Sequence, residues 1–311
     1  RKTVKDRTEA HARTKGLFNI TVTPFTSDGS FDFRALAENI ERVISTGYDG
    51  LLIGGTYGEF PTMTADERVG LFRAAMDAAG DRVPVLLCTA HSDVRVAREL
   101  TAQAGELGGL PMVTAPYVSE ITEEQIETFF VEMATRSRTG IMVYNAPGIG
   151  ITLSPGLIDR LADIDGVVAL KQGDLNPTVV DQLASTVVGR IRVLAASDLV
   201  FLGPLAAGFD GLSSTNSCAL PEIIHATYKA QTGGDPARAA ELHRRWYPLR
   251  ALARRYGQPQ TTKAIMNLRG WTGGHVRAPL LDLNAERIAE VEKALASVAG
   301  GSDFSFGDLS A

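Results

Sequence analysis

Short apolar stretches alternate along the chain with longer segments of helical periodicity. Eight of these stretches have the character of β-strands, at residues 17–25, 50–55, 83–89, 110–116, 141–147, 167–172, 192–197 and 211–216. Runs that are apolar at successive positions and bounded by turn residues are typical of strands buried on both faces. Their alternation with helical segments predicts right-handed βαβ units and a parallel sheet.

Helix-start signals between the stretches support this pattern. Asp32 precedes an amphipathic run, and Thr64 with Glu67 and Thr122 with Gln125 have the spacing of capping boxes. Eight strand–helix repeats predict a (β/α)8 TIM barrel over residues 17–232. A doubly wound Rossmann sheet is the alternative, but no G-x-G-x-x-G follows the first stretch.

The segments outside the barrel differ in character. Three helical segments, at 235–257, 260–273 and 284–298, predict a three-helix C-terminal appendage (233–298) that packs on the barrel, because no linker-like stretch separates them from it. The charged residues 1–16 predict a flexible N-terminal arm, and residues 299–311 predict a flexible tail.

Composition and charge exclude several classes of partner. The chain has 311 residues, of which 44% are hydrophobic and 22% charged, and its net charge is −5. This balance gives no basis for binding nucleic acid or an anionic membrane, and no apolar run approaches the ~20 residues needed to span a bilayer. Residues 1–16 lack the apolar core of a signal peptide. Cys88 and Cys218 lie in apolar segments without a Cys/His cluster, which predicts free thiols, no metal site and a reducing, cytoplasmic setting.

One lysine interrupts the sixth apolar stretch, G-V-V-A-L-K-Q-G-D at 166–174. Lysine is almost never fully buried without a partner or a purpose. In a barrel of this type the carboxyl ends of the strands form the active-site mouth, which is where Lys171 would lie. Desolvation lowers the pKa of an amine, and a neutral amine attacks a ketone to give a Schiff base. A buried ion pair and an anion ligand remain the alternatives for Lys171.

Other strand ends offer groups that suit such chemistry. Tyr144 ends the fifth stretch and could move the protons that imine formation requires. Gly55 and Thr56 follow the second stretch and could provide amide and hydroxyl donors for a carboxylate. His91, on a predicted loop, is an alternative base.

Four motifs together resemble those of the N-acetylneuraminate lyase / dihydrodipicolinate synthase family. They are G-G-T-Y-G-E-F-P-T-M-T (54–64), M-V-Y-N-A-P-G (142–148), V-V-A-L-K-Q (167–172) and A-A-G-F-D-G-L-S-S-T-N-S (206–217), and the resemblance runs from about Leu17 to Val298. It implies that Lys171 forms the imine, that Tyr144 shuttles protons with Thr56 as its hydroxyl relay, and that the backbone at Thr56 and Tyr57 holds the carboxylate of a 2-oxo acid. It also implies that no cofactor is needed and that the chain is a homo-oligomer, commonly a tetramer.

Three departures distinguish the chain from the synthases of this family. Tyr57 stands where threonine is usual, and Val118 stands where the synthases have a second tyrosine that completes a relay between subunits. Ile149 replaces an arginine that holds the second substrate's carboxylate. Dihydrodipicolinate synthesis is therefore the less expected activity, because loss of a bidentate clamp leaves a carboxylate unpaired.

The sialic-acid lyases of the family share the apolar residue at 149 but carry Asp-Glu where this chain has Asp198-Leu199. Gly173 replaces a hydroxyl-bearing residue, which suggests open space for a shorter or partly apolar aldehyde. The residues expected to bind substrate are Gly55, Tyr57, Gly173, Asp198, Leu212 and Ser214.

These features predict a Schiff-base-forming aldolase or lyase that joins or separates pyruvate and an aldehyde. Dehydration of a 2-keto-3-deoxy sugar acid through the same imine is the main alternative. A protein that only binds a 2-oxo acid is the non-enzymatic alternative, although such a protein would not need the lysine, tyrosine and threonine together.

Overall fold

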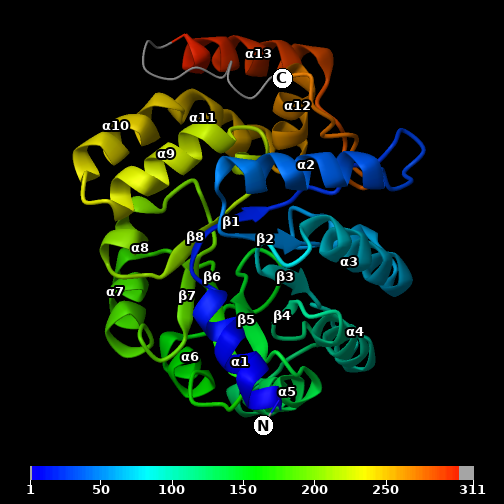
Figure 1. Cartoon of the computed structure of the whole chain (residues 1–311), viewed down its shortest axis with the longest axis vertical. Helices are drawn as coiled ribbons and strands as arrows, with labels where there is room; N and C mark the ends of the chain where they lie inside the picture. Colours follow the sequence, from blue (N-terminus) through cyan, green and yellow to red (C-terminus); the bar gives the residue numbers. More distant parts are fainter. Residues whose placement is uncertain (1, 301–311) are drawn as a thin grey trace.

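Eight parallel strands close into a barrel in the order of the sequence (Figure 1). The structure, a computed structural model, describes residues 2–300. The strands are β1 Gly16–Ile20, β2 Gly50–Ile53, β3 Val85–Cys88, β4 Leu110–Val113, β5 Ile141–Asn145, β6 Val167–Gln172, β7 Arg192–Ala195 and β8 Gly211–Ser214. The predicted TIM barrel is thus confirmed. Most strands end earlier than predicted because the last apolar residues of the stretches belong to the loops of the mouth.

A helix follows each strand and covers the outside of the barrel. These helices are α2 Phe33–Thr46, α3 Ala65–Ala79, α4 Val94–Glu106, α5 Glu123–Arg136, α6 Pro155–Leu161, α7 Pro177–Thr186, α8 Leu202–Ala206 and α9 Pro221–Thr232, with short 3-10 turns η1 Phe60–Thr62 and η2 Asn216–Cys218. Both predicted capping boxes form, at Thr64 with Glu67 and at Thr122 with Gln125.

Alternate residues of the strands face opposite sides of the barrel wall. One apolar cluster fills the interior and includes Phe18, Leu52, Met112 and Leu194. A second, larger cluster lies between the strands and the surrounding helices. This alternation decides which strand-end residues can face a substrate.

The N-terminal segment differs from the predicted flexible arm. Residues Lys2–Arg13 form helix α1, which lies across one end of the barrel (Figure 1). Arg7 donates a hydrogen bond to Asp165 at 2.7 Å, and Arg138 donates one to Asp6 at 2.8 Å. The high charge of this segment suggested an arm, but the charges form ion pairs with the barrel.

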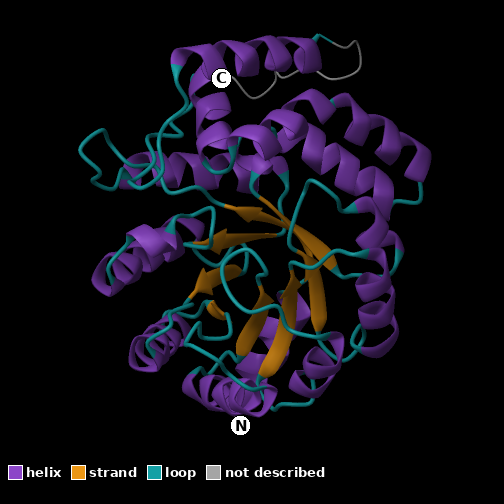
Figure 2. Ribbon diagram, turned by 180° about the vertical axis from the view of Figure 1, so that it is seen from behind, coloured by secondary structure: helices purple, strands orange, loops and turns teal. Residues whose placement is uncertain are grey.

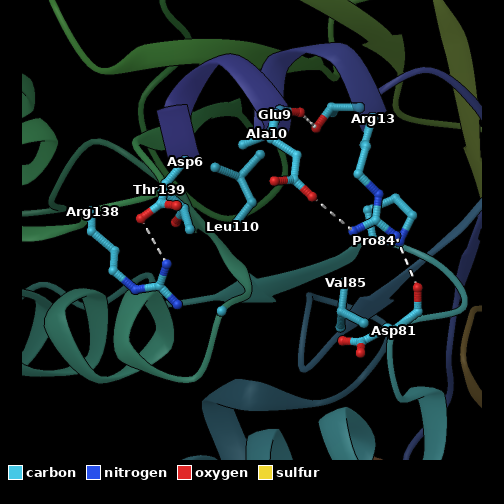
Figure 3. A pocket seen from close by; sticks show the side chains of 12 residues that line it. Asp6, Glu9, Ala10, Arg13, Asp81, Pro84, Val85, Leu110, Arg138 and Thr139 are labelled. Atoms are coloured by element: carbon cyan, nitrogen blue, oxygen red, sulfur yellow. Dashed lines mark hydrogen bonds and ion pairs between the residues drawn. The ribbon is translucent and has the colours of Figure 1, made fainter. Parts of the chain in front are cut away.

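A cavity of about 210 Å³ lies beside α1 (Figure 3). Its lining includes Arg13 from α1, and Val85 and Leu110 from the first residues of β3 and β4. It therefore opens at the amino ends of the strands, the opposite end of the barrel from Lys171 in β6.

Four helices follow α9 in the described part of the chain, where three were predicted. They are α10 Pro236–Arg245, α11 Tyr247–Tyr256, α12 Gln260–Leu268 and α13 Ala285–Ala299, and they gather with α9 on one side of the barrel (Figure 2). The first predicted segment breaks at Trp246 because Pro248 has no N–H to continue the hydrogen-bond ladder. The tail predicted at 299–311 lies, from residue 301, outside the described residues. Within residues 2–300, none of the helices combines the length and the apolar character that crossing a bilayer requires.

Candidate active site

Lys171 lies in the mouth of the barrel and is almost completely buried, with 2% of its surface exposed. It pairs in register with Tyr144 of β5 and Leu194 of β7, which both belong to the interior cluster. Its Nζ lies 4.2 Å from the centroid of the Tyr144 ring. Among the described residues, no carboxylate forms an ion pair with Lys171. The alternative that Lys171 belongs to a buried ion pair is therefore not supported in this part of the chain.

The environment of Lys171 favours its neutral form. Burial lowers the pKa of Lys171 to about 8, because moving an ammonium out of water costs free energy that no neighbouring anion repays. A substantial fraction of the amine is therefore unprotonated at mildly alkaline pH.

The ring of Tyr144 lies against this amine, and its hydroxyl contacts Thr56. The Tyr144 hydroxyl lies 3.2 Å from Thr56 Oγ1, and either oxygen could donate. Burial raises the pKa of Tyr144 to about 12, while the bond with Thr56 acts in the opposite direction. The phenol thus stays protonated at neutral pH and can act as a proton donor. The predicted proximity of Lys171, Tyr144 and Thr56 is present.

The turn after β2 is too tight for side chains at two glycines. A Cβ at Gly55 would lie 2.7 Å from Leu52 Cδ2, and one at Gly58 would lie 2.9 Å from Gly54 Cα. Glycine at position 58 lets the backbone of the turn approach Gly54 closely, so that the chain reverses directly after β2.

Backbone hydrogen bonds within this turn leave two amides unused. Gly58 N donates to Gly55 O and Glu59 N donates to Thr56 O, both at 3.1 Å. The amides of Thr56 and Tyr57 make no hydrogen bond to any described residue. Adjacent free N–H groups can bind an anion, and the position of the 2-oxo-acid carboxylate at this turn stays a prediction.

Tyr57 and Ile149 give the mouth an apolar wall. Both side chains are partly buried and pack against the interior cluster. Burial also raises the pKa of Tyr57. The predicted apolar character at these two positions fits their packing.

The prediction of open space at Gly173 is wrong. Gly173 N donates to Asn145 O at 2.8 Å, and a Cβ at Gly173 would lie 2.4 Å from that oxygen and 2.8 Å from Pro147 Cδ. Glycine at this position makes room for the end of β5, and no space for a substrate is left on that side.

Two other expected substrate-binding residues, Leu212 and Ser214, lie on the outer face of β8, and Asp198 is hydrogen-bonded to one of them. Asp198 accepts hydrogen bonds from Ser214 Oγ at 2.6 Å and from Asn216 N and Nδ2, both at 2.8 Å. Burial raises the pKa of Asp198, and these bonds oppose that shift. Leu212 belongs to the outer cluster, and Ser214 lies on the same face of β8 two residues later. These residues tie the loop after β7 to the end of β8.

Ser213 is the strand-8 residue that faces the interior, but it is not among the residues predicted to bind substrate. It pairs in register with Phe18 of the interior cluster, and its Oγ donates to Ala195 O at 3.2 Å. The period of two along a strand is the signal that separates Ser213 from its two neighbours.

His91 is exposed, and its Nδ1 accepts a hydrogen bond from Asp93 N at 2.9 Å, so it belongs to a surface turn. Cys88 and Cys218 are free and buried, as predicted. In residues 2–300 no group of three or more His, Cys, Asp or Glu side chains is placed to hold a metal ion.

Comparisons with known proteins agree with this architecture. Residues 13–298 match the model of the dihydrodipicolinate synthetase family. The 4-hydroxy-tetrahydrodipicolinate synthase 1 of Halalkalibacterium halodurans is 31% identical over 277 residues, which cover 88% of this chain and 94% of that protein. The dihydrodipicolinate synthase of Thermotoga maritima is similar in structure, with a TM-score of 0.86 and 26% identity over 92% of this chain and 98% of the other. The Acinetobacter baumannii synthase, solved in complex with pyruvate, has a TM-score of 0.87 and 24% identity over 92% and 99% of the two chains.

A closed parallel barrel together with these matches defines a class I aldolase or lyase. The chain belongs to the dihydrodipicolinate synthetase family, whose members act through a lysine Schiff base and need no cofactor.

Proposed function

We propose that the chain cleaves a 4-hydroxy-2-oxo acid into pyruvate and an aldehyde, or catalyses the reverse, through an imine on Lys171. The observation that carries the proposal is the buried amine of Lys171, which has no carboxylate partner among the described residues and lies against a tyrosine whose hydroxyl meets Thr56. The pyruvate bound by the Acinetobacter baumannii synthase supports a pyruvate unit as the common part of the substrate.

Imine formation uses all three side chains. The carboxylate of the 2-oxo acid lies on the free amides of Thr56 and Tyr57, and the neutral amine of Lys171 attacks the ketone carbon. The amine passes one of its protons to the ketone oxygen and Tyr144 donates a second, so that this oxygen leaves as water and a protonated imine remains. The Thr56 hydroxyl donates its hydrogen bond to the phenolate that is left on Tyr144.

Cleavage then follows from the charge of the imine. The protonated imine accepts the electron pair of the bond between C3 and C4 as the C4 hydroxyl loses its proton and the aldehyde departs. The positive charge of the imine lies close to the Tyr144 ring and stabilises the phenolate form of this residue. Tyr144, which donates a proton during imine formation, can therefore accept the proton of the C4 hydroxyl during cleavage. Protonation of the enamine at C3 and hydrolysis release pyruvate and restore the amine.

The wall of the mouth limits the second substrate. Ile149 and Tyr57 pack on the interior cluster and present apolar surface, where the synthases that the sequence resembles use an arginine at the first of these positions. An acceptor with its own carboxylate would be left unpaired there, at a cost of several kcal/mol. A short or partly apolar aldehyde suits the wall better.

Synthesis of 4-hydroxy-tetrahydrodipicolinate is the second candidate, favoured by the name of the 31% identical relative. It shares the pyruvate imine and differs only in the acceptor. A homo-oligomer, expected to be a tetramer from the resemblance, is compatible with either reaction.

A substrate panel tests the proposal. The purified chain is incubated with 4-hydroxy-2-oxo acids bearing apolar or polyhydroxylated tails, with 2-keto-3-deoxy sugar acids, and with pyruvate plus aspartate semialdehyde. Released pyruvate, dehydrated product and condensation product are quantified by NMR, with Lys171→Ala as the matched inactive control. Pyruvate release from an apolar-tailed acid is expected. Condensation with the semialdehyde at a higher rate than any cleavage would instead establish the second candidate, and dehydration without pyruvate release would contradict both.

A further inference from the structure

A buried ion pair joins the turn after β2 to the C-terminal helices. Lys263 of α12 donates to Glu59 Oε2 at 2.5 Å, and the side chains are 2% and 0% exposed. Lys263 also donates to His275 O at 2.7 Å, and Arg277 N donates to Glu59 Oε1 at 2.9 Å. Both carboxylate oxygens of Glu59 are thus held by the segment from α12 to residue 277.

Glu59 adopts a backbone conformation that glutamate rarely takes. Its φ is +66°, and Ser119 is the only other non-glycine residue of residues 2–300 with a positive φ. Such a conformation is strained for a residue with a side chain and persists where its surroundings over-determine it. Glycine would occupy this position without strain, so the carboxylate itself must account for the glutamate.

Glu59 follows Thr56 and Tyr57 closely in the chain, and its backbone is hydrogen-bonded to the Thr56 carbonyl. Its N–H donates to Thr56 O at 3.1 Å, which closes the turn that carries the free amides and the Thr56 hydroxyl. Thr23 Oγ1 donates to Gly58 O at 2.8 Å and fixes the turn from the other side. A shift of Glu59 would therefore move Thr56 and, with it, the group that contacts Tyr144.

Stability alone does not explain the pair. Replacing a buried ion pair by apolar side chains of similar volume is often neutral or stabilising. What a buried pair adds is a fixed geometry between two specific groups. We propose that Glu59 is a positioning residue of the active site: bound to Lys263, it sets the placement of the Thr56–Tyr57 amides. The inference rests on the proposed function for the identity of the anion, and on the structure alone for the placement of the turn.

The test compares Glu59→Gln with a matched control, Glu222→Gln. Glu222 accepts from Arg269 at 3.0 Å in a pair that is also buried, with 8% and 9% of the side chains exposed, and it links the C-terminal helices to α9 without touching the turn. Two readouts are used: hydrogen exchange of the peptide 54–63 in the full-length chain, and the pyruvate concentration that gives half-maximal trapping by borohydride.

Glu59→Gln is expected to increase the rate of hydrogen exchange at the backbone amides of positions 58 and 59 about tenfold. It is also expected to raise the pyruvate concentration that gives half-maximal trapping about tenfold. Trapping at saturating pyruvate should fall by less than about threefold. Glu222→Gln is expected to change neither readout, although both variants lower the melting temperature. Where Glu59→Gln does not fold, Lys263→Met is expected to give the same split.

Unchanged exchange and unchanged half-saturation in Glu59→Gln would overturn the inference, as would an equal effect of Glu222→Gln. Failure of the unmutated chain to be trapped would refute the proposed function instead, and the exchange comparison would still decide the placement of the turn.

Discussion

Two lysines of this chain are buried to nearly the same extent and have different neighbours. Lys171 is 2% exposed and Lys263 is 1% exposed. Lys263 has Glu59 at 2.5 Å, whereas Lys171 has the face of Tyr144 at 4.2 Å. Burial lowers the pKa of both amines, but at Lys263 the carboxylate opposes the shift.

The comparison shows that burial alone does not make a lysine a nucleophile. A buried ammonium that is paired with a carboxylate stays charged and fixes two segments relative to each other. A buried ammonium without such a partner is destabilised by desolvation and loses its proton more easily. The reactive lysine is therefore recognised by the absence of a carboxylate partner in the described structure and by a proton donor close by.

The largest expected effect separates the two lysines by activity. Exchange of the pyruvate methyl protons with D2O needs the enamine, so Lys171→Ala should lower the rate of this exchange by about 10⁴-fold or more. Lys263→Met should retain most of this exchange at saturating pyruvate. NMR of pyruvate in D2O measures both, and comparable losses in the two variants would erase the distinction.

Removing the proton donor should have the next largest effect. Tyr144→Phe keeps the ring against Lys171 but deletes the hydroxyl that meets Thr56. We expect methyl-proton exchange to fall about 10²- to 10³-fold, in the range of lost general acid–base catalysis. Circular dichroism serves as the control for folding, and exchange within threefold of the unmutated chain would show that another group moves the proton.

Stability should respond with opposite signs at the two positions. Lys171→Met removes an amine whose pKa in the folded state is about 8, below its ordinary value of 10.5. The charged amine destabilises the folded state most fully below pH 8, so the variant should be more stable at pH 7, by on the order of 3 kcal/mol. This advantage should shrink as pH rises from about 8 to 10.5, where the unfolded chain also loses the proton.

Lys263→Met should instead destabilise the fold by about 3–5 kcal/mol, because it leaves Glu59 buried without its cation. Urea unfolding at pH 7 and pH 10 measures both variants. The same sign for both substitutions at pH 7 would show that the two sites are not electrostatically distinct.

The smallest effect is the pH dependence of imine formation in the unmutated chain. Trapping at low pyruvate should rise about tenfold per unit below pH 8 and level off above it, because only the neutral amine of Lys171 attacks. Tyr144, with a pKa of about 12, should not cause a fall below pH 10. Borohydride trapping measured at a series of pH values across this range gives the pH profile. A midpoint near pH 10.5 would mean that Lys171 is solvated.

Much of the fold and of the candidate site could be predicted from the sequence, and the features that could not be predicted have physical reasons. Local patterns located the eight strands and the ends that carry Lys171, Tyr144 and Thr56. The face of a strand on which a residue lies depends on register, which is why Leu212 and Ser214 were expected to bind substrate and Ser213 was not.

Long-range packing accounts for the other differences. Gly173 suggested open space, but the end of β5 occupies it. Helix α1 was taken for an arm because the barrel residues that pair with its charges lie more than a hundred positions away, as with Arg7 and Asp165. The partner of Lys263 is 204 residues distant, and nothing in the local sequence indicates it.

The most direct test of the central claim is covalent trapping with pyruvate. The full-length chain is reduced with borohydride in the presence of pyruvate, digested, and mapped by peptide mass spectrometry. One reduced pyruvate on Lys171, with Lys263 unmodified, is the predicted result. Modification of another lysine, or none at any pyruvate concentration and pH between 7 and 10, would contradict the assignment of Lys171 as the imine-forming residue.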